Sequence, residues 1–191
     1  MKLLPTLIFL LIALLTPAAN AATPADDFRQ GESLYDSGDY LSALKAWGRA
    51  AKEGNTEAQY RIGLMFMDGK GMKPNPGDAA YWFRKAAQNG HAAAQFEIAY
   101  CFEHGVGVQR DQRIAAEWYW RAAEQGDPDA AFNLAAMYRD GRGMTRDLDK
   151  ARKYYAIAAK GGLADAQAEL DKLPAPQKQV AHHRSSRKSR K

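Results

Sequence analysis

Residues 92–127 read AAAQFEIAYCFEHGVGVQRDQRIAAEWYWRAAEQGD, and a similar stretch stands 36 residues before it and 36 residues after it. Aligning the chain on itself at this shift needs no gap and places glycine on glycine, alanine on alanine and ring on ring. The aligned sets include Gly69, Gly105 and Gly141; Gly71, Gly107 and Gly143; Ala79, Ala115 and Ala151; Trp82, Trp118 and Tyr154; and Phe83, Tyr119 and Tyr155. So many matches at one shift predict three tandem 36-residue repeats over residues 56–163.

Each repeat is predicted to be a pair of helices. Apolar residues recur at helical spacing in the first half of the unit, at Ile62, Met65 and Phe66, and again over residues 79–87. Residues that favour helix ends flank the second helices: Asn75, Asp111 and Asp147 before them, and Gly54, Gly90, Gly126 and Gly162 after them. The next first helix follows at once, so the pairs must stack. The pattern predicts an all-α fold, a right-handed α-solenoid of stacked antiparallel helical hairpins.

Related but shorter pieces flank the three repeats. Residues 23–55 match both helices of the unit but have a connection four residues shorter, Ser37-Gly38-Asp39-Tyr40. Residues 164–173 match a first helix only, and their polar later positions are typical of a helix that caps a repeat stack. Residues 174–191 hold two early prolines and no acidic residue, so we expect a disordered basic tail.

Two motifs carry a resemblance to a known family. Residues 58–71 follow the pattern Ala-Gln-Tyr-x-Ile-Gly-x-x-Phe-x-x-Gly-x-Gly, and residues 79–90 follow Ala-x-x-Trp-Phe-x-Lys-Ala-Ala-x-x-Gly. Together they resemble the Sel-one-like repeat (SLR), an α-solenoid relative of the tetratricopeptide repeat (TPR), and residues 23–55 resemble a TPR-like hairpin. The resemblance implies a scaffold or adaptor role without catalytic residues. Disulfide-rich relatives carry a cysteine pair in each repeat, whereas this chain has Cys101 alone.

Residues 1–22 have the features of a cleavable secretory signal peptide. Lys2 precedes an apolar run over residues 7–15, and an Ala-x-Ala motif ends at Ala21. A helix over the apolar run would rise only about 14 Å, too short for a hydrocarbon core of about 30 Å. No cysteine near the cleavage region could carry a lipid anchor. We therefore expect cleavage after Ala21 or Ala22, a periplasmic or secreted protein, and no transmembrane segment in the mature chain.

The net charge of +5 comes from one end of the chain, because the remainder without Lys2 is close to neutral. The basic residues of the tail are Lys178, Arg184, Arg187, Lys188, Arg190 and Lys191. Such a tail is expected to attract an anionic envelope polymer or lipid surface, more than nucleic acid, and to do so in a salt-sensitive way. The alternative is a tail that only increases solubility.

No pattern in the sequence is typical of catalysis. The four histidines do not form a spaced ligand set with Cys101, and we interpret that cysteine as a buried bystander. Residues 68–71 resemble a phosphate-binding loop, but no strand precedes them and the Lys-Ser/Thr ending is absent. We therefore expect no enzyme activity, no cofactor and no metal. The aromatic pairs at 82–83, 118–119 and 154–155 are interpreted as packing between hairpins.

Positions that differ between repeats are candidates for partner binding, because the stack does not require them. The first helices of a solenoid line its concave face. Three series on the first helix vary: Leu64, Tyr100 and Ala136; Met67, Glu103 and Arg139; and Asp68, His104 and Asp140. We predict that the partner-binding residues are Leu64, Met67, Tyr100, Glu103, His104 and Arg139. Tyr100 is the foremost of them, because aromatic residues are prominent in interfaces. The alternative is a solvated face that binds nothing.

Trp120 is a second candidate. Its counterparts in the neighbouring repeats are Arg84 and Ala156, so the repeat does not require an apolar side chain at this position. Trp120 is either an exposed contact for a partner or a side chain that packs under the next hairpin. The sequence leaves both interpretations open.

These features predict an exported scaffold for protein–protein interaction that binds a peptide or protein on its concave solenoid surface. One alternative is a regulator that docks a cell-envelope or secretion enzyme. Another is a polyanion or cell-wall binder that acts through the basic tail.

Overall fold

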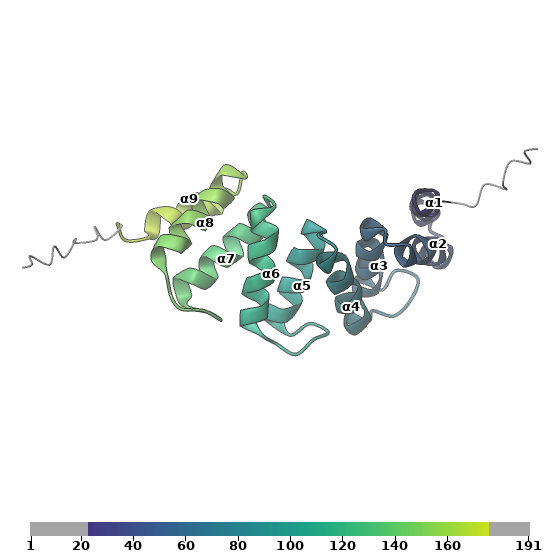
Figure 1. The fold of residues 1–191 in the computed structure, drawn as a ribbon, viewed down its shortest axis with the longest axis horizontal. Coiled ribbons are helices and arrows are strands. Elements are labelled where there is room, and N and C mark those ends of the chain that lie inside the picture. Colours follow the sequence, from purple (N-terminus) through teal and green to yellow (C-terminus); the bar gives the residue numbers. More distant parts are fainter. Residues whose placement is uncertain (1–22, 176–191) are drawn as a thin grey trace, which may run out of the picture.

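The computed structural model describes residues 23–175, and this part of the chain forms nine α-helices and no strand (Figure 1). The helices are α1 (Pro24–Asp36), α2 (Tyr40–Lys52), α3 (Thr56–Asp68), α4 (Pro76–Gln88), α5 (Ala92–His104), α6 (Gln112–Glu124), α7 (Pro128–Asp140), α8 (Leu148–Lys160) and α9 (Ala164–Lys172). The predicted signal peptide and the predicted basic residues of the tail lie outside the described residues.

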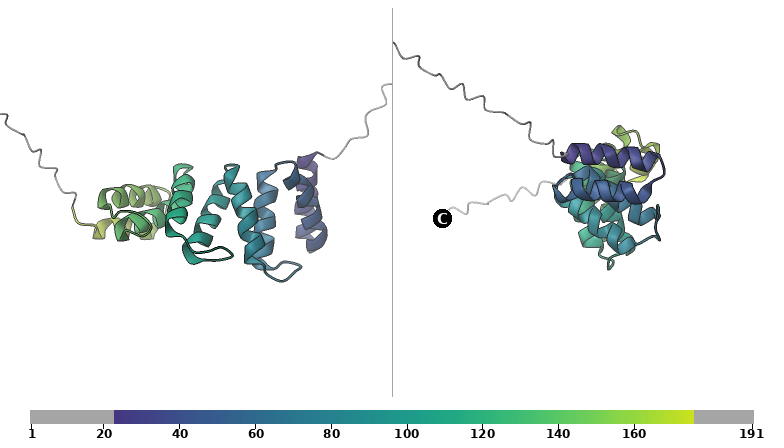
Figure 2. Two further views of the ribbon diagram at one scale, coloured as in Figure 1. Left: turned by 60° about the horizontal axis from the view of Figure 1, so that its bottom comes forward. Right: turned by 90° about the vertical axis from the view of Figure 1, so that its right-hand side faces the viewer.

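The helices stack in one elongated row (Figures 1 and 2). The tightest pairs are the hairpins α1–α2, α3–α4, α5–α6 and α7–α8, and each hairpin then packs on the next. The termini of the described chain lie at opposite ends of the row. The predicted all-α solenoid with a 36-residue repeat is confirmed.

The helix ends follow the predicted signals. Asn75, Asp111 and Asp147 each accept a hydrogen bond from a backbone N–H in the first turn of the helix that follows. The glycines predicted to end the second helices all have positive φ: Gly54, Gly90, Gly126 and Gly162. The cap of α5 was not apparent from the sequence, because it is a histidine: His91 Nδ1 accepts from the Ala94 N–H at 3.2 Å.

The core is rich in alanines and aromatic rings and forms two clusters, one between α2 and α3 and a larger one from α4 to α9. Phe83, Tyr119 and Tyr155 stand at one position of successive repeats and are fully buried. The ring of Phe83 lies against Gly63, where a Cβ atom would come within 2.5 Å of it. In this repeat the glycine lets the ring lie directly against α3, whereas the later repeats hold Tyr119 and Tyr155 with Ala99 and Ala135 at the position of Gly63. Cys101 is also fully buried, as predicted.

The aromatic residues at the position before these rings differ in burial from repeat to repeat. Tyr154 is buried, but Trp82 and Trp118 are only half-buried. Lys85 lies over the ring of Trp82 at 5.1 Å from its centroid, and Arg121 lies over Trp118 at 4.7 Å. Each of these two tryptophans therefore packs partly against the core, as predicted, and partly lies under a cation of its own helix.

A hydrogen-bonded ladder of buried glutamines joins the first hairpins. Gln59 donates from Nε2 to the carbonyl oxygen of Ala51 at 3.0 Å and accepts at Oε1 from Asn89 at 3.3 Å. The same two bonds recur one repeat later around Gln95. The third repeat has Ala131 at this position, so the ladder ends there and the last hairpins are held by other contacts.

Candidate protein-binding surfaces

The first helices α1, α3, α5, α7 and α9 share one surface, which we call the first-helix surface. Ion pairs connect neighbouring helices along it. Arg61 on α3 lies 3.5 Å from Glu32 on α1, and Arg139 on α7 lies 2.5 Å from Glu169 on α9. The six predicted partner-binding residues all belong to α3, α5 and α7.

Tyr100 and His104 are the predicted residues that the structure places in solvent. Both side chains are exposed, and 41% of Tyr100 is accessible. They lie one turn apart on α5 with their rings stacked at 4.1 Å. His104 Nδ1 also lies 3.0 Å from the carbonyl oxygen of Tyr100, which fixes the histidine ring against the tyrosine. The pair forms a flat, partly aromatic platform in the middle of the row.

Leu64 and Met67 contribute less surface than predicted. Both are partly buried and pack against the hydrophobic core. They stand on α3, one repeat before the aromatic platform. Their accessible atoms can extend an apolar surface from the platform, but most of each side chain supports the stack.

Glu103 occupies a different environment from that of a partner contact. Its side chain is buried, accepts a hydrogen bond from the Tyr119 hydroxyl at 2.9 Å and forms an ion pair with Arg142. Burial and the neighbouring carboxylate raise the pKa of Tyr119, so the hydroxyl stays protonated and donates. Arg142 belongs to the loop between α7 and α8. Glu103 therefore ties α5 and α6 to a loop of the next hairpin.

Arg139 is likewise engaged within the protein. It pairs with Asp140 at 2.7 Å as well as with Glu169 on α9. Its hydrogen bond to Asp140 is the main cause of a lowered pKa of that carboxyl group. Arg139 thus holds the last helix on the row, and its charge is neutralised by two carboxylates.

Carboxylates surround the aromatic platform. Glu97 lies one turn before Tyr100 on α5 and makes no ion pair with any other described residue. Burial raises the pKa of Glu97, and the negative charges of Asp68 and Asp127 raise it further. The carboxylates of Asp68 and Asp127 thus lie close enough to Glu97 to disfavour its charged form.

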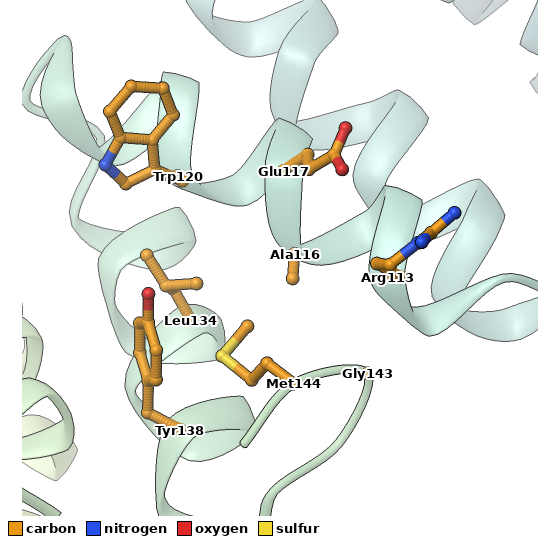
Figure 3. Close-up of a pocket in the computed structure, with 8 residues that line it drawn as sticks. All are labelled: Arg113, Ala116, Glu117, Trp120, Leu134, Tyr138, Gly143 and Met144. Carbon is orange, nitrogen blue, oxygen red and sulfur yellow. The ribbon is translucent and has the colours of Figure 1, made fainter. Parts of the chain in front are cut away.

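Trp120 lines a groove between successive hairpins, and 46% of the residue is exposed. The groove has a volume of about 260 Å³. Figure 3 shows Trp120 and Glu117 projecting from α6, with Leu134 and Tyr138 of α7 below them. Ala116, Arg113, Gly143 and Met144 complete the lining. Trp120 is therefore an accessible side chain at the edge of an apolar groove.

The preceding repeat has an equivalent groove with a different lining. Arg84 stands where the next repeat has Trp120, and its guanidinium lies over the ring of Phe102 at 5.3 Å from the centroid. Phe102 and Val108 correspond to Tyr138 and Met144. The two grooves thus share an aromatic floor. In the groove of the preceding repeat, Arg84 lies over that floor.

The described part of the chain holds no group of three or more His, Cys, Asp or Glu side chains arranged to bind a metal. Burial raises the pKa of the Cys101 thiol to about 11, so this cysteine is a poor nucleophile. Across residues 23–175, no helix is long and apolar enough to cross a membrane.

Comparison with curated proteins gives no significant match. Solved structures do match, and one is a Sel1 repeat protein from Oxalobacter formigenes. It is 35% identical with a TM-score of 0.69, over 78% of this chain and 62% of that one. A second is c5321, a protective antigen of uropathogenic Escherichia coli with an SLR fold. It is 27% identical with a TM-score of 0.51, over 77% of this chain and 40% of that one. This chain thus spans less than two thirds of either protein.

Helicobacter pylori cysteine-rich protein B shares the fold at 21% identity, with a TM-score of 0.53 over 66% of this chain and 96% of that one. The family model of the Sel1 repeat matches residues 56–91, 92–127 and 128–163, more than half of the sequence. These are the three units found by aligning the sequence on itself. The chain belongs to the Sel1 repeat family.

Proposed function

We propose that this protein is an exported scaffold that holds a segment of a partner protein on the concave face of its solenoid. The first helices would form that face, and its centre would be the platform of Tyr100 and His104. Sel1 repeat proteins are generally scaffolds for protein interaction, and their fold is generally non-catalytic. The proposal needs no cofactor and takes a protein or peptide as the partner.

The exposure of Tyr100 is the observation that carries the proposal. The stack does not require an aromatic side chain at this position, because the neighbouring repeats have Leu64 and Ala136 there. An exposed tyrosine offers a rigid apolar ring and a hydroxyl group, the combination that dominates binding energy in interfaces. Glu97 on the same side of α5 adds a charge that can orient a partner.

Site-specific photo-crosslinking tests this proposal. A photoreactive phenylalanine replaces Tyr100 in the full chain, produced in the cells that make the protein, and crosslinked proteins are identified by mass spectrometry. Tyr81 is the matched control, because it is also a tyrosine, is 59% exposed and stands on a second helix, α4.

We expect discrete crosslinked partners from position 100 and none of the same proteins from position 81. The same set of proteins from both positions would contradict a binding site on the concave face. No crosslink from either position, with the protein at its normal level, would contradict the scaffold function itself.

Export is tested separately by fractionation and by sequencing the N-terminus of the mature protein. We expect a chain that begins at residue 22 or 23 in the periplasmic or secreted fraction. A chain that retains Lys2 and stays with the cytoplasmic fraction would contradict export but leave the binding proposal standing.

A further inference from the structure

The tryptophans of the second helices differ in how their rings are covered. Trp82 has Lys85 over its ring, and Trp118 has Arg121 over its ring. In each case the cation stands three residues later, where side chains of one helix face meet. Stacking of a cation on an indole stabilises both groups. The chain therefore covers these two partly buried tryptophans with its own basic residues.

Trp120 has no such cover. The residue three positions later is Ala123, and none of the cations in the described part of the chain lies over the indole ring. The residue three positions earlier is Glu117, which is exposed and makes no ion pair with another described residue. Arg113 lies one turn before it and is not paired with it. An open indole ring and an unpaired carboxylate thus share one helix face (Figure 3).

The preceding groove indicates what such a site takes up. There the guanidinium of Arg84 lies over the Phe102 ring. The planar guanidinium stacks on aromatic rings and pairs with carboxylates at its edge, which an ammonium does less well. In the next groove Trp120 stands in the place of Arg84, and the lining includes Glu117 and Arg113, which are not paired with each other. The open face of the indole and the carboxylate of Glu117 can therefore take an arginine supplied from outside.

We propose that the Trp120 groove binds a protein segment that carries an arginine beside an apolar residue. The guanidinium stacks on the Trp120 indole and pairs with Glu117, while the apolar side chain packs on Leu134, Tyr138 and Met144. This site is separate from the concave face and does not depend on it. A scaffold with both sites holds two segments, of one partner or of two.

The direct test follows the indole N–H signal of Trp120 by nuclear magnetic resonance in the purified protein. The probe is the peptide acetyl-Leu-Arg-Leu-amide, and the matched control peptide has citrulline, which is planar but uncharged, in place of arginine. The Trp120 signal is assigned with Trp120→Phe, and the signals of Trp82 and Trp118 are internal controls because their rings are already covered.

We expect the arginine peptide to shift the Trp120 signal with a dissociation constant on the order of 1 mM and to leave Trp82 and Trp118 unchanged. Citrulline should weaken binding about tenfold, since it loses both the cation–ring contact and the ion pair. Glu117→Gln should remove most of the difference between the peptides. Trp120→Arg, which copies the chain's own Arg84, should abolish binding, as followed by the backbone amide signals of Leu134 and Tyr138 because the indole signal is then absent.

A control variant is Leu41→Ala, which removes an exposed apolar side chain from α2, far from the groove, and should leave binding unchanged. Equal shifts with both peptides, or a preference for arginine that Glu117→Gln leaves undiminished, would overturn the proposal. So would a Trp120 signal that moves, without peptide, when Arg184, Arg187 and Arg190 are replaced by glutamine. That result would assign the groove to the chain's own tail.

Discussion

Glu103 and Arg142 show how a single position changes its chemistry from repeat to repeat. Their counterparts in the preceding repeat are Met67 and Val106, an apolar pair that packs against the same core. The ion pair therefore fills a place that the fold also fills without charge. The carboxylate is buried, whereas a third of the Arg142 side chain is accessible. Removal of Arg142 and removal of Glu103 should therefore lower the free energy of unfolding by different amounts.

This difference gives a prediction for the stability of single and double variants. Arg142→Val leaves a buried carboxylate without its cation and should lower the free energy of unfolding by about 3 kcal/mol. Glu103→Met frees an arginine that can turn to water and should cost about 1–2 kcal/mol. The double variant, which copies Met67 and Val106, should recover most of the loss. Urea unfolding of all four proteins measures this, and strictly additive losses would show that the two residues do not interact.

Glu97 makes the stability depend on pH. Its pKa is raised in the folded protein, chiefly by burial, so the unfolded chain releases this proton at lower pH than the folded chain does. Ionisation of Glu97 therefore opposes folding as the pH rises above the ordinary value of 4.5. Glu97→Gln should be more stable than the natural protein at pH 7, and the gain should vanish below pH 4.5. Thermal unfolding across this range checks the sign, and a gain that persists at low pH would refute it.

The candidate residues could be found from the sequence only in part. Variation between repeats selected Tyr100 and His104, which are exposed, but it also selected residues that support the stack. It could not show that Glu103 meets Arg142 or that Arg139 meets Glu169. These partners lie 39 and 30 residues away, in the next structural layer. A position that varies between repeats can hold a polar residue, but the variation does not tell whether that side chain faces water or another charged group.

At the scale of helices, two glycines inside first and second helices have opposite roles. Gly63 on α3 faces the Phe83 ring closely, whereas Gly48 on α2 has no atom within 4 Å of the place where a Cβ would stand. Glycine within a helix is otherwise unfavourable, because it loses more backbone freedom on folding than alanine does. The packing, and not the helix, therefore decides which of the two can be replaced.

Gly63→Ala should lower the free energy of unfolding by about 1–3 kcal/mol, because the added methyl group collides with the ring. Gly48→Ala should raise it by about 0.5–1 kcal/mol through helix propensity alone. The two variants share one chemical change, so each is the control for the other in a denaturant titration. Equal effects of the same sign would contradict the packing described for α3 and α4.

The limits of the helices were largely predictable, because capping residues and glycines act within one turn. The cap of α5 was missed, since histidine is an unusual residue to accept the first N–H bonds. The partial exposure of Trp82 and Trp118 was not predicted either, although Lys85 and Arg121 stand three residues later in the sequence. Whether a ring packs inward or lies under a cation depends on the neighbouring helix, which the repeat pattern does not specify.

As a whole, the protein is a row in which each hairpin contacts only its neighbours (Figure 2). Stability in such a row is a sum of units and of the interfaces between them. The glutamine ladder strengthens the early interfaces, and the ion pair of Arg139 with Glu169 attaches α9 at the other end. The elongated row and its order could be predicted from the 36-residue repeat, since stacking follows from the short connections.

Local stability should accordingly change only near the altered interface. Glu169→Gln weakens the attachment of α9, and amide hydrogen exchange should accelerate in α8 and α9. Exchange in α1 to α4, which the hairpin α5–α6 separates from the hairpin α7–α8 and from α9, should stay as in the natural protein. Faster exchange over the whole chain would show instead that the row unfolds as one unit.

The central claim is that the first-helix surface binds a partner through Tyr100. Its most direct measurement is the affinity of a partner recovered by crosslinking at position 100 for three purified proteins: the natural chain, Tyr100→Ala and Tyr81→Ala. Tyr100→Ala should weaken binding at least about tenfold without changing the midpoint of thermal unfolding, and Tyr81→Ala should bind as the natural chain does. Equal affinities for all three proteins would contradict the claim.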